Sequence, residues 1–129
     1  MILSEKGHLA YAIQYVMNMK IDKKVSGITE IFYLRGELTI STSDEFRAFF
    51  LDITVGEGNR VLLNLAEMKY LDSMGMAAII DLMKNFRDRG ISLALCDIQP
   101  NVMSILKITR FDKVMTIFLS EGEAVKGEW

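Results

Sequence analysis

The sequence predicts an α/β domain with a mixed sheet of about five strands, an N-terminal hairpin followed by parallel strands, covered by about four helices. Residues 19–25 and 28–38 look like two strands joined at Ser26-Gly27, and the second is rich in β-branched and aromatic residues, so a hairpin is expected. Later apolar runs alternate between strand and helix spacing, and this indicates crossovers between parallel strands. With 129 residues, 50% of them hydrophobic, the chain suffices for a single core.

After the hairpin, a helix is predicted over the phenylalanine-rich segment. Thr42 and Glu45 match a capping box, and apolar residues follow at helical spacing, namely Phe46, Phe49, Phe50 and Ile53. We expect about three turns, ending near Gly56 or Gly58.

In the second half of the chain, the pattern of apolar residues predicts two strand–helix units followed by a last strand. Residues 60–71 form the third strand, and residues 74–89 form a helix that Gly90 ends. The next strand covers 91–98. Gln99-Pro100-Asn101 then opens a helix to about Thr109, because proline is favoured in the first helical turn. Residues 114–119 are the last strand.

The two ends of the chain are treated separately from this core. Residues 1–18 are an N-terminal extension and residues 19–129 are the domain. Apolar residues at helical spacing predict a helix over 8–17, packed on the sheet or on a second copy of the chain. The alternative is a start placed too far upstream, with Met17 or Met19 as the true first residue. The tail from Glu121 predicts a short final helix with a frayed Trp129.

Composition excludes several classes of function. A formal net charge of −2 argues against general nucleic-acid binding, which needs a basic stripe. The single cysteine, Cys96, lies in an apolar run and is expected in the core, so no internal disulfide forms and a reducing compartment is indicated. The apolar stretch 9–17 is about half of a bilayer crossing. We therefore expect a cytoplasmic protein.

The most informative stretch is residues 62–76, in which a buried-type strand ends in Asp72, Ser73 and Gly75 at the start of a helix. Strand ends in α/β domains bring polar groups to a surface, and helix N-termini attract anions. Ser73 is therefore a natural place to carry a phosphate. The alternative is that Ser73 is only the N-cap of that helix.

These residues carry a resemblance to a known family. The order of elements, the Gly36-Glu37-Leu38 end of the second strand, the Asp72-Ser73-Met74-Gly75 turn and the helix–strand pattern from Ile105 to Val114 resemble the STAS domain, and more narrowly the bacterial anti-sigma factor antagonists. The resemblance covers roughly residues 19–125. The Asp-Ser-x-Gly turn between an apolar strand and an amphipathic helix is its most specific part.

The resemblance implies a partner switch. In that family, an anti-sigma factor that is also a serine kinase, with an ATP-binding histidine-kinase-like fold, phosphorylates the serine after the aspartate, and a metal-dependent serine phosphatase removes the phosphate. The acceptor here is Ser73. The unmodified antagonist binds the anti-sigma factor and the phosphorylated form releases it. The alternative is an unswitched STAS scaffold or a module of a sensory complex; a transporter STAS module is disfavoured because no spanning segment precedes the domain.

Several residues around Ser73 are candidates for partner contact. Asp72 orients the Ser73 hydroxyl or contacts the kinase, or it is simply an acid favoured beside a helix N-terminus. Gly75 allows a partner backbone to approach, or it serves helix–sheet packing. Met74 and Met76, with Met83, form an adaptable contact surface or belong to the core. The neighbouring loop adds Thr39, Ser41 and Thr42, and the strand end adds Lys69 and Tyr70.

Three positions depart from the family pattern. Thr39 stands where many members carry an aspartate near the acceptor, which bears on kinase recognition. Met74 stands where a second serine or threonine is frequent, so Ser73 is the only hydroxyl in the turn. Residues 109–111 replace a small residue or glycine before the last strand.

No enzyme is predicted. Nucleophilic use of Ser73 would need a base, and the only histidine, His8, lies in the extension. The chain shows no Gly-x-Ser-x-Gly elbow, glycine-rich phosphate loop, dinucleotide fingerprint or cluster of metal ligands, so no cofactor or metal is expected. A receiver domain would need a cluster of acids early in the chain, whereas the first strands end in Glu37-Leu38-Thr39.

Overall fold

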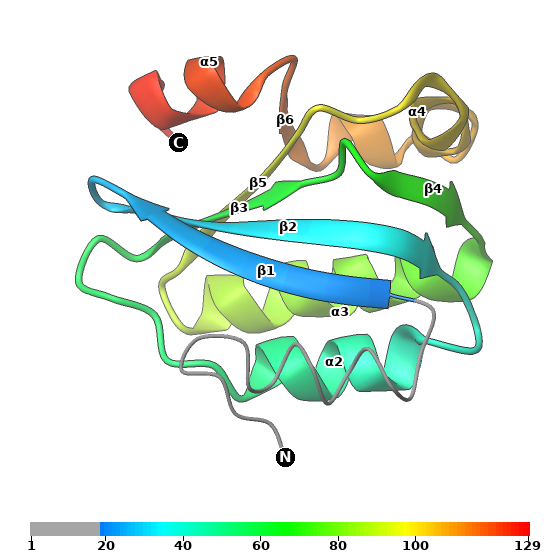
Figure 1. Cartoon of the computed structure of the whole chain (residues 1–129), viewed down its shortest axis with the longest axis horizontal. Coiled ribbons are helices and arrows are strands. Elements are labelled where there is room, and N and C mark those ends of the chain that lie inside the picture. Colours follow the sequence, from blue (N-terminus) through cyan, green and yellow to red (C-terminus); the bar gives the residue numbers. More distant parts are fainter. Residues whose placement is uncertain (1–18) are drawn as a thin grey trace.

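The computed structural model describes residues 19–129, which form a mixed sheet with helices on both faces (Figure 1). The predicted helix over 8–17 and His8 lie outside the described residues. The strands are β1 (Met19–Ser26), β2 (Thr29–Leu38), β3 (Arg60–Asn64), β4 (Met68–Leu71), β5 (Ser92–Cys96) and β6 (Thr116–Phe118). The helices are α2 (Ser43–Leu51), α3 (Ser73–Asp88), α4 (Pro100–Ile108) and α5 (Glu121–Lys126), with a single 3₁₀ turn η1 (Phe111–Lys113).

The sheet confirms the predicted hairpin and the parallel strands that follow. β1 and β2 pair antiparallel around Gly27, whose φ of 60° suits a tight turn. The strand order is β1-β2-β3-β5-β6, and all pairs after the hairpin are parallel. The described residues thus form six strands and four α-helices, close to the predicted number of each.

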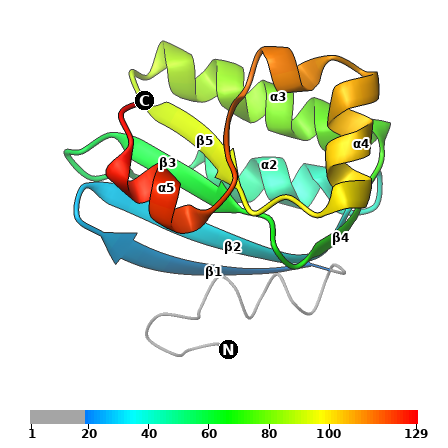
Figure 2. The same ribbon diagram turned by 90° about the horizontal axis from the view of Figure 1, so that it is seen from above.

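The core lies between the sheet and the helices α2 and α3, which cover one face together (Figures 1 and 2). Phenylalanine rings dominate its centre, where Phe32, Phe46 and Phe50 are fully buried. The rings of Phe32 and Phe50 pack edge to face, with their centroids 5.1 Å apart. These aromatic pairs add to the hydrophobic effect. The helix α5 covers part of the opposite face and closes a smaller apolar cluster that includes the buried Cys96, as predicted for that residue.

The prediction of one continuous strand over 60–71 is wrong, because the chain bends after Asn64 and forms two strands, β3 and β4. The Asn64 side chain accepts the Ala66 N–H at 2.9 Å, a local turn that competes with the strand ladder. β3 pairs with the first half of β2, and β4 pairs with its last residues, Gly36 to Leu38. The bend therefore directs β4, and the residues after it, toward the end of β2.

The helix α2 differs from its prediction at both ends. Thr42 occupies the N-cap position, but its side chain makes no cap hydrogen bond, so the predicted capping box does not form. At the other end the helix stops at Leu51 instead of near Gly56 or Gly58. The residues Ile53-Thr54-Val55 are β-branched and disfavour helix, and the Arg89 guanidinium donates to the Ile53 carbonyl at 2.7 Å.

The C-terminal tail is ordered as the predicted short helix, but Trp129 is not frayed. The Trp129 Nε1–H donates to the Ala124 carbonyl at 2.8 Å. The guanidinium of the buried Arg60 lies 4.1 Å from the centre of the Trp129 ring and also donates to the carbonyl oxygens of Ala124, Val125 and Gly127. Arg60 thus helps to satisfy the carbonyls at the end of α5, where a helix runs out of its own N–H donors.

Candidate functional site

The candidate site lies where β2 and β4 end and α3 begins. Leu38 and Leu71 are paired across the last rung of these strands, and the Asp72 N–H continues the contact by donating to the Leu38 carbonyl at 3.3 Å. The next residue, Ser73, begins α3 and is exposed. The fold therefore presents the Ser73 hydroxyl at the surface, at the positive end of a helix dipole.

Asp72 is the N-cap of α3, so the alternative in which Ser73 serves as the cap is wrong. The Asp72 backbone is extended, with φ −105° and ψ −176°, and its Oδ1 accepts the Gly75 N–H at 2.8 Å. Aspartate is among the preferred N-cap residues because its side chain satisfies a helix N–H that has no helical partner. Ser73 is left as the first helical residue, without a capping task.

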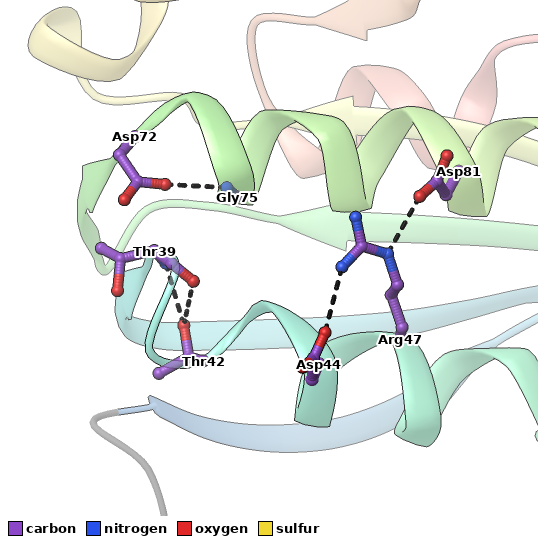
Figure 3. A network of polar contacts seen from close by, with 7 residues as sticks. All are labelled: Thr39, Thr42, Asp44, Arg47, Asp72, Gly75 and Asp81. Atoms are coloured by element: carbon purple, nitrogen blue, oxygen red, sulfur yellow. Dashed lines mark hydrogen bonds and ion pairs between the residues drawn. The ribbon is translucent and has the colours of Figure 1, made fainter.

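The second oxygen of the same carboxylate holds a different segment. Asp72 Oδ2 accepts the Ile40 N–H at 3.0 Å, and Ile40 lies in the loop of residues 39–42 between β2 and α2. Figure 3 shows Asp72 above this loop, with its other oxygen directed to Gly75. One side chain therefore ties the start of α3 to the loop that follows β2.

The 39–42 loop is itself braced by Thr42. The Thr42 Oγ1 accepts the Thr39 N–H at 2.9 Å (Figure 3). The same hydroxyl donates to the Glu37 carbonyl at 3.0 Å. Thr39 in turn accepts the Ser41 N–H on its side-chain oxygen at 3.2 Å. Thr42 is buried, so it shapes the loop from within instead of offering its side chain to a partner.

Gly75 is buried against β2, which favours the packing alternative for this residue. A Cβ at Gly75 would overlap the Leu38 carbonyl oxygen and lie 2.7 Å from its carbon. The space left by the missing side chain is filled by Leu38 of the same chain, so no room remains for a partner backbone at that point. The close packing draws the first turn of α3 onto the end of the sheet.

The remaining candidates divide between surface and core. Met74 is 41% exposed, whereas Met76 belongs to the core and accepts a hydrogen bond from the Thr109 hydroxyl on its sulfur at 3.4 Å. Ser41, Lys69 and Tyr70 are exposed and Thr39 is half-buried. The predicted methionine surface is thus reduced to Met74, with Met83 half-buried on the same helix.

Sequence reasoning missed Ile40 as a member of this site. Its side chain is 67% exposed although it is a large aliphatic residue. The available signal was an isoleucine alone among hydroxyl residues, in Thr39-Ile40-Ser41-Thr42. Such a residue in a loop either anchors the loop in the core or is presented to solvent, and only the structure distinguishes the two.

An ion-pair network fixes α2 beside α3. Arg47 on α2 contacts Asp81 on α3 at 2.9 Å and Asp44 at 3.4 Å (Figure 3). Partly exposed pairs contribute little free energy. Their geometry, however, holds the two helices that flank the 39–42 loop in a defined relation.

A separate polar cluster lies under α5, on the opposite face of the sheet. Burial, and then the hydrogen bond to the Glu121 carboxylate, raises the pKa of Tyr33 to about 12. Burial also raises the pKa of the Cys96 thiol, and a hydrogen bond to Asp97 adds to this. A buried, protonated thiol is a poor nucleophile.

The raised pKa of Tyr33 gives a testable pH dependence. In an ultraviolet absorbance titration, the difference between wild type and a Tyr33→Phe variant is expected to have its midpoint near pH 12. The pKa is higher in the folded state than the unfolded value of about 10, so the stability due to this phenol is complete below pH 10 and is lost as pH rises through about 12. Glu121→Gln should lower the midpoint, and a wild-type midpoint near 10 would contradict the burial.

Within residues 19–129, no group of three or more metal-ligating side chains comes together. None of the helices in this same part of the chain has the length and apolar character to cross a bilayer. The chemistry that the described site offers is an exposed hydroxyl, a carboxylate engaged by two backbone amides, and exposed apolar side chains around them.

Comparisons with known proteins agree with the fold. A family model of the STAS domain matches residues 20–124. The anti-sigma F factor antagonist of Paenibacillus polymyxa is 29% identical over 110 residues, which cover 84% of this chain and 94% of the relative. An anti-sigma-factor antagonist (STAS) domain protein from Planctomyces limnophilus superposes with a TM-score of 0.70 at 19% identity, covering 81% and 94% of the two chains. The Bacillus cell fate determinant SpoIIAA in its phosphorylated form gives a TM-score of 0.58 at 18% identity, with 83% and 96% covered.

Proposed function

The chain belongs to the STAS domain family, and from that premise we propose that it is an anti-sigma factor antagonist that acts by partner switching in the cytoplasm. In this proposal, the form with an unmodified Ser73 binds an anti-sigma factor that is also a serine kinase with an ATP-binding, histidine-kinase-like fold. Phosphorylation of Ser73 releases that partner, and a metal-dependent serine phosphatase restores the binding form. The chain itself catalyses no reaction.

The observation that carries the proposal is the placement of Ser73. It is exposed, it begins α3, and the capping task belongs to its neighbour Asp72. A hydroxyl that lies at a helix N-terminus without capping the helix is suited to modification, because the helix dipole stabilises an added anion. Relatives named as anti-sigma factor antagonists, and a relative solved in a phosphorylated form, support the same role.

The physical effect of a phosphate differs between the fold and the interface. It adds about −1.5 to −2 charges at neutral pH, beside the carboxylate of Asp72. Within the fold, this charge remains in water and faces the start of α3. A partner surface that covers Ser73 would have to remove water from the dianion, and the interaction would lose free energy. Binding is thus switched while the fold is retained.

The test is intact-mass measurement and peptide mapping after incubation with ATP and an extract of the host cell. We expect one added phosphate that maps to Ser73 and is absent in Ser73→Ala. Ser41→Ala is the matched control, since Ser41 is an exposed serine on the adjacent loop, and it should be modified like wild type. If Ser73 stays unmodified in an extract whose kinases act on another substrate, the switch is wrong and an unswitched STAS interaction module remains.

A further inference from the structure

Asp72 does more than cap a helix, because its carboxylate joins two segments that are far apart in the chain. Oδ1 holds Gly75 of α3 at 2.8 Å and Oδ2 holds Ile40 of the 39–42 loop at 3.0 Å. A helix cap uses only one of these oxygens. The second bond therefore needs its own explanation, and its direct effect is to fix the backbone from which the Ile40 side chain projects.

Ile40 combines an exposed aliphatic side chain with a backbone that is held by hydrogen bonds. Its side chain is 67% exposed, yet its backbone is held by Asp72 and the residues on either side are held by the Thr39–Thr42 hydrogen bonds. A pinned loop that presents a large aliphatic side chain to water loses little conformational entropy when a partner binds it. Rigid apolar anchors of this kind carry much of the energy of protein interfaces.

Other exposed apolar side chains come from the same end of the sheet. Met74 directly follows Ser73 in α3, and Tyr70 lies on β4, where its backbone pairs with Glu37 of β2. Both are among the exposed large hydrophobic residues of the described chain. Exposed apolar side chains thus come from all three segments that meet at this end of the sheet, the 39–42 loop, α3 and β4. The exposed charged residues of the same segments are Glu37 at the end of β2, Lys69 on β4 and Asp44 at the start of α2, and Asp44 is paired with Arg47.

We propose that Asp72 is a positioning residue that fixes Ile40 beside Ser73, so that Ile40 and Met74 form the apolar contact for the kinase that modifies Ser73. This deepens the proposed function and rests on it. The complementary partner surface is apolar at its centre, to receive Ile40 and Met74, and carries a basic group toward Glu37. Asp72 acts here through the loop and not through contact with the reacting hydroxyl.

The first arm of the test measures amide hydrogen exchange by NMR and needs no partner. In Asp72→Asn, the side-chain NH₂ cannot accept a hydrogen bond, so one of the two N–H bonds is lost while asparagine still caps α3. We expect the Ile40 amide to exchange about tenfold faster, since a hydrogen bond to a carboxylate is lost. Gly75 and Met76 should keep their protection. Asp72→Ser is the second variant, in case asparagine perturbs folding. Serine is also a good N-cap, but its shorter side chain has a single oxygen and cannot hold Gly75 and Ile40 together.

The second arm measures steady-state phosphorylation of Ser73 by the kinase purified from host extract through that activity. Ile40→Ala and Asp72→Asn are each expected to raise KM about tenfold, the effect of losing a buried aliphatic contact, with kcat near wild type. Ile28→Ala is the matched control. Ile28 is the same residue type and 61% exposed, but it precedes β2 at the opposite end from the site.

The outcomes separate this inference from the proposed function. An Ile40 amide that exchanges equally in wild type and in both Asp72 variants overturns the positioning role of Asp72. A wild-type KM in Ile40→Ala, with Ser73 modified normally, overturns the contact while the proposed switch stands. A wild-type protein that no host kinase modifies overturns the proposed function and the contact together, and the exchange data still decide whether Asp72 holds the loop.

Discussion

A Gly75→Ala variant is expected to lose about 3 kcal/mol or more of unfolding free energy, at the upper end of single-residue effects. The added Cβ would overlap the Leu38 carbonyl oxygen and lie 2.7 Å and 2.9 Å from the Leu38 carbonyl carbon and Cγ. Leu38 cannot move aside easily, because its backbone pairs with Leu71 and accepts the Asp72 N–H. Equilibrium urea denaturation followed by circular dichroism measures the loss.

Gly122→Ala is the matched control, because Gly122 also lies in the first turn of a helix. The nearest atom to a Cβ at Gly122 is the Ser120 Oγ, at 4.0 Å. Alanine favours helix over glycine by about 0.5–1 kcal/mol, so this variant should be as stable as wild type or slightly more so. A Gly75→Ala protein with wild-type stability would show that α3 shifts away from β2 without loss, and the close packing described for this site would then be wrong.

Gly75 also shows what local sequence patterns can and cannot predict. The change from a strand-like run to helical spacing after Asp72 was visible in the sequence, and it correctly predicted that a strand end meets a helix start there. The same local rules predicted the hairpin at Gly27 and the helix start at Pro100. The use of Gly75 was left open between two roles, because the atom that fills its empty space belongs to Leu38.

The errors arose where distant residues or competing local bonds decide the structure. Periodicity could not detect the bend after Asn64, since the residues directly before and after it are apolar. The bend is held by the hydrogen bond from the Ala66 N–H to the Asn64 side chain and by the bond from the Met68 N–H to the Leu65 carbonyl. Trp129 was expected to fray because it is the last residue of the chain, and its contact with Arg60 of β3 could not be inferred from the local sequence. In each case the sequence near the residue is compatible with both outcomes, and one specific set of contacts, local for Asn64 and tertiary for Trp129, selects between them.

The candidate site follows the same rule. Ser73 and Asp72 were found because their roles depend on residues within one helical turn, although both are acceptable caps and the structure was needed to choose Asp72. Ile40 was missed because its position depends on Asp72 Oδ2, which is 32 residues away in the sequence. The local hydrogen bonds of Thr39 and Thr42 shape the loop, but the contact that ties Ile40 to α3 comes from a distant carboxylate and leaves almost no local signal.

A Ser73→Glu variant is expected to bind the proposed kinase partner more than a hundredfold more weakly than wild type, a loss of about 3 kcal/mol. The carboxylate would be placed at the start of α3, where the free protein tolerates it because water and the helix dipole stabilise it. In the complex, the same charge would lie between the apolar contacts of Ile40 and Met74 and would lose its hydration. Isothermal titration calorimetry with the purified kinase measures the change.

Ser26→Glu is the control, since Ser26 lies at the hairpin tip, at the opposite end of β2 from Ser73. It adds the same charge and should bind like wild type. Urea denaturation should give nearly equal stabilities for both variants and wild type, which would exclude unfolding as the cause of weak binding. Equal affinities of Ser73→Glu and Ser26→Glu would mean that the partner does not cover Ser73.

Salt dependence then distinguishes two ways in which the added charge could act. Long-range repulsion between Ser73→Glu and acids on the partner would be screened at 1 M salt, where the Debye length is about 3 Å. Loss of hydration on burial is a local effect and is screened much less. Since Ser73 is bordered by exposed apolar side chains, we expect most of the hundredfold difference to persist at high salt. Recovery of wild-type affinity there would instead assign the switch to repulsion across the interface, without close contact at Ser73.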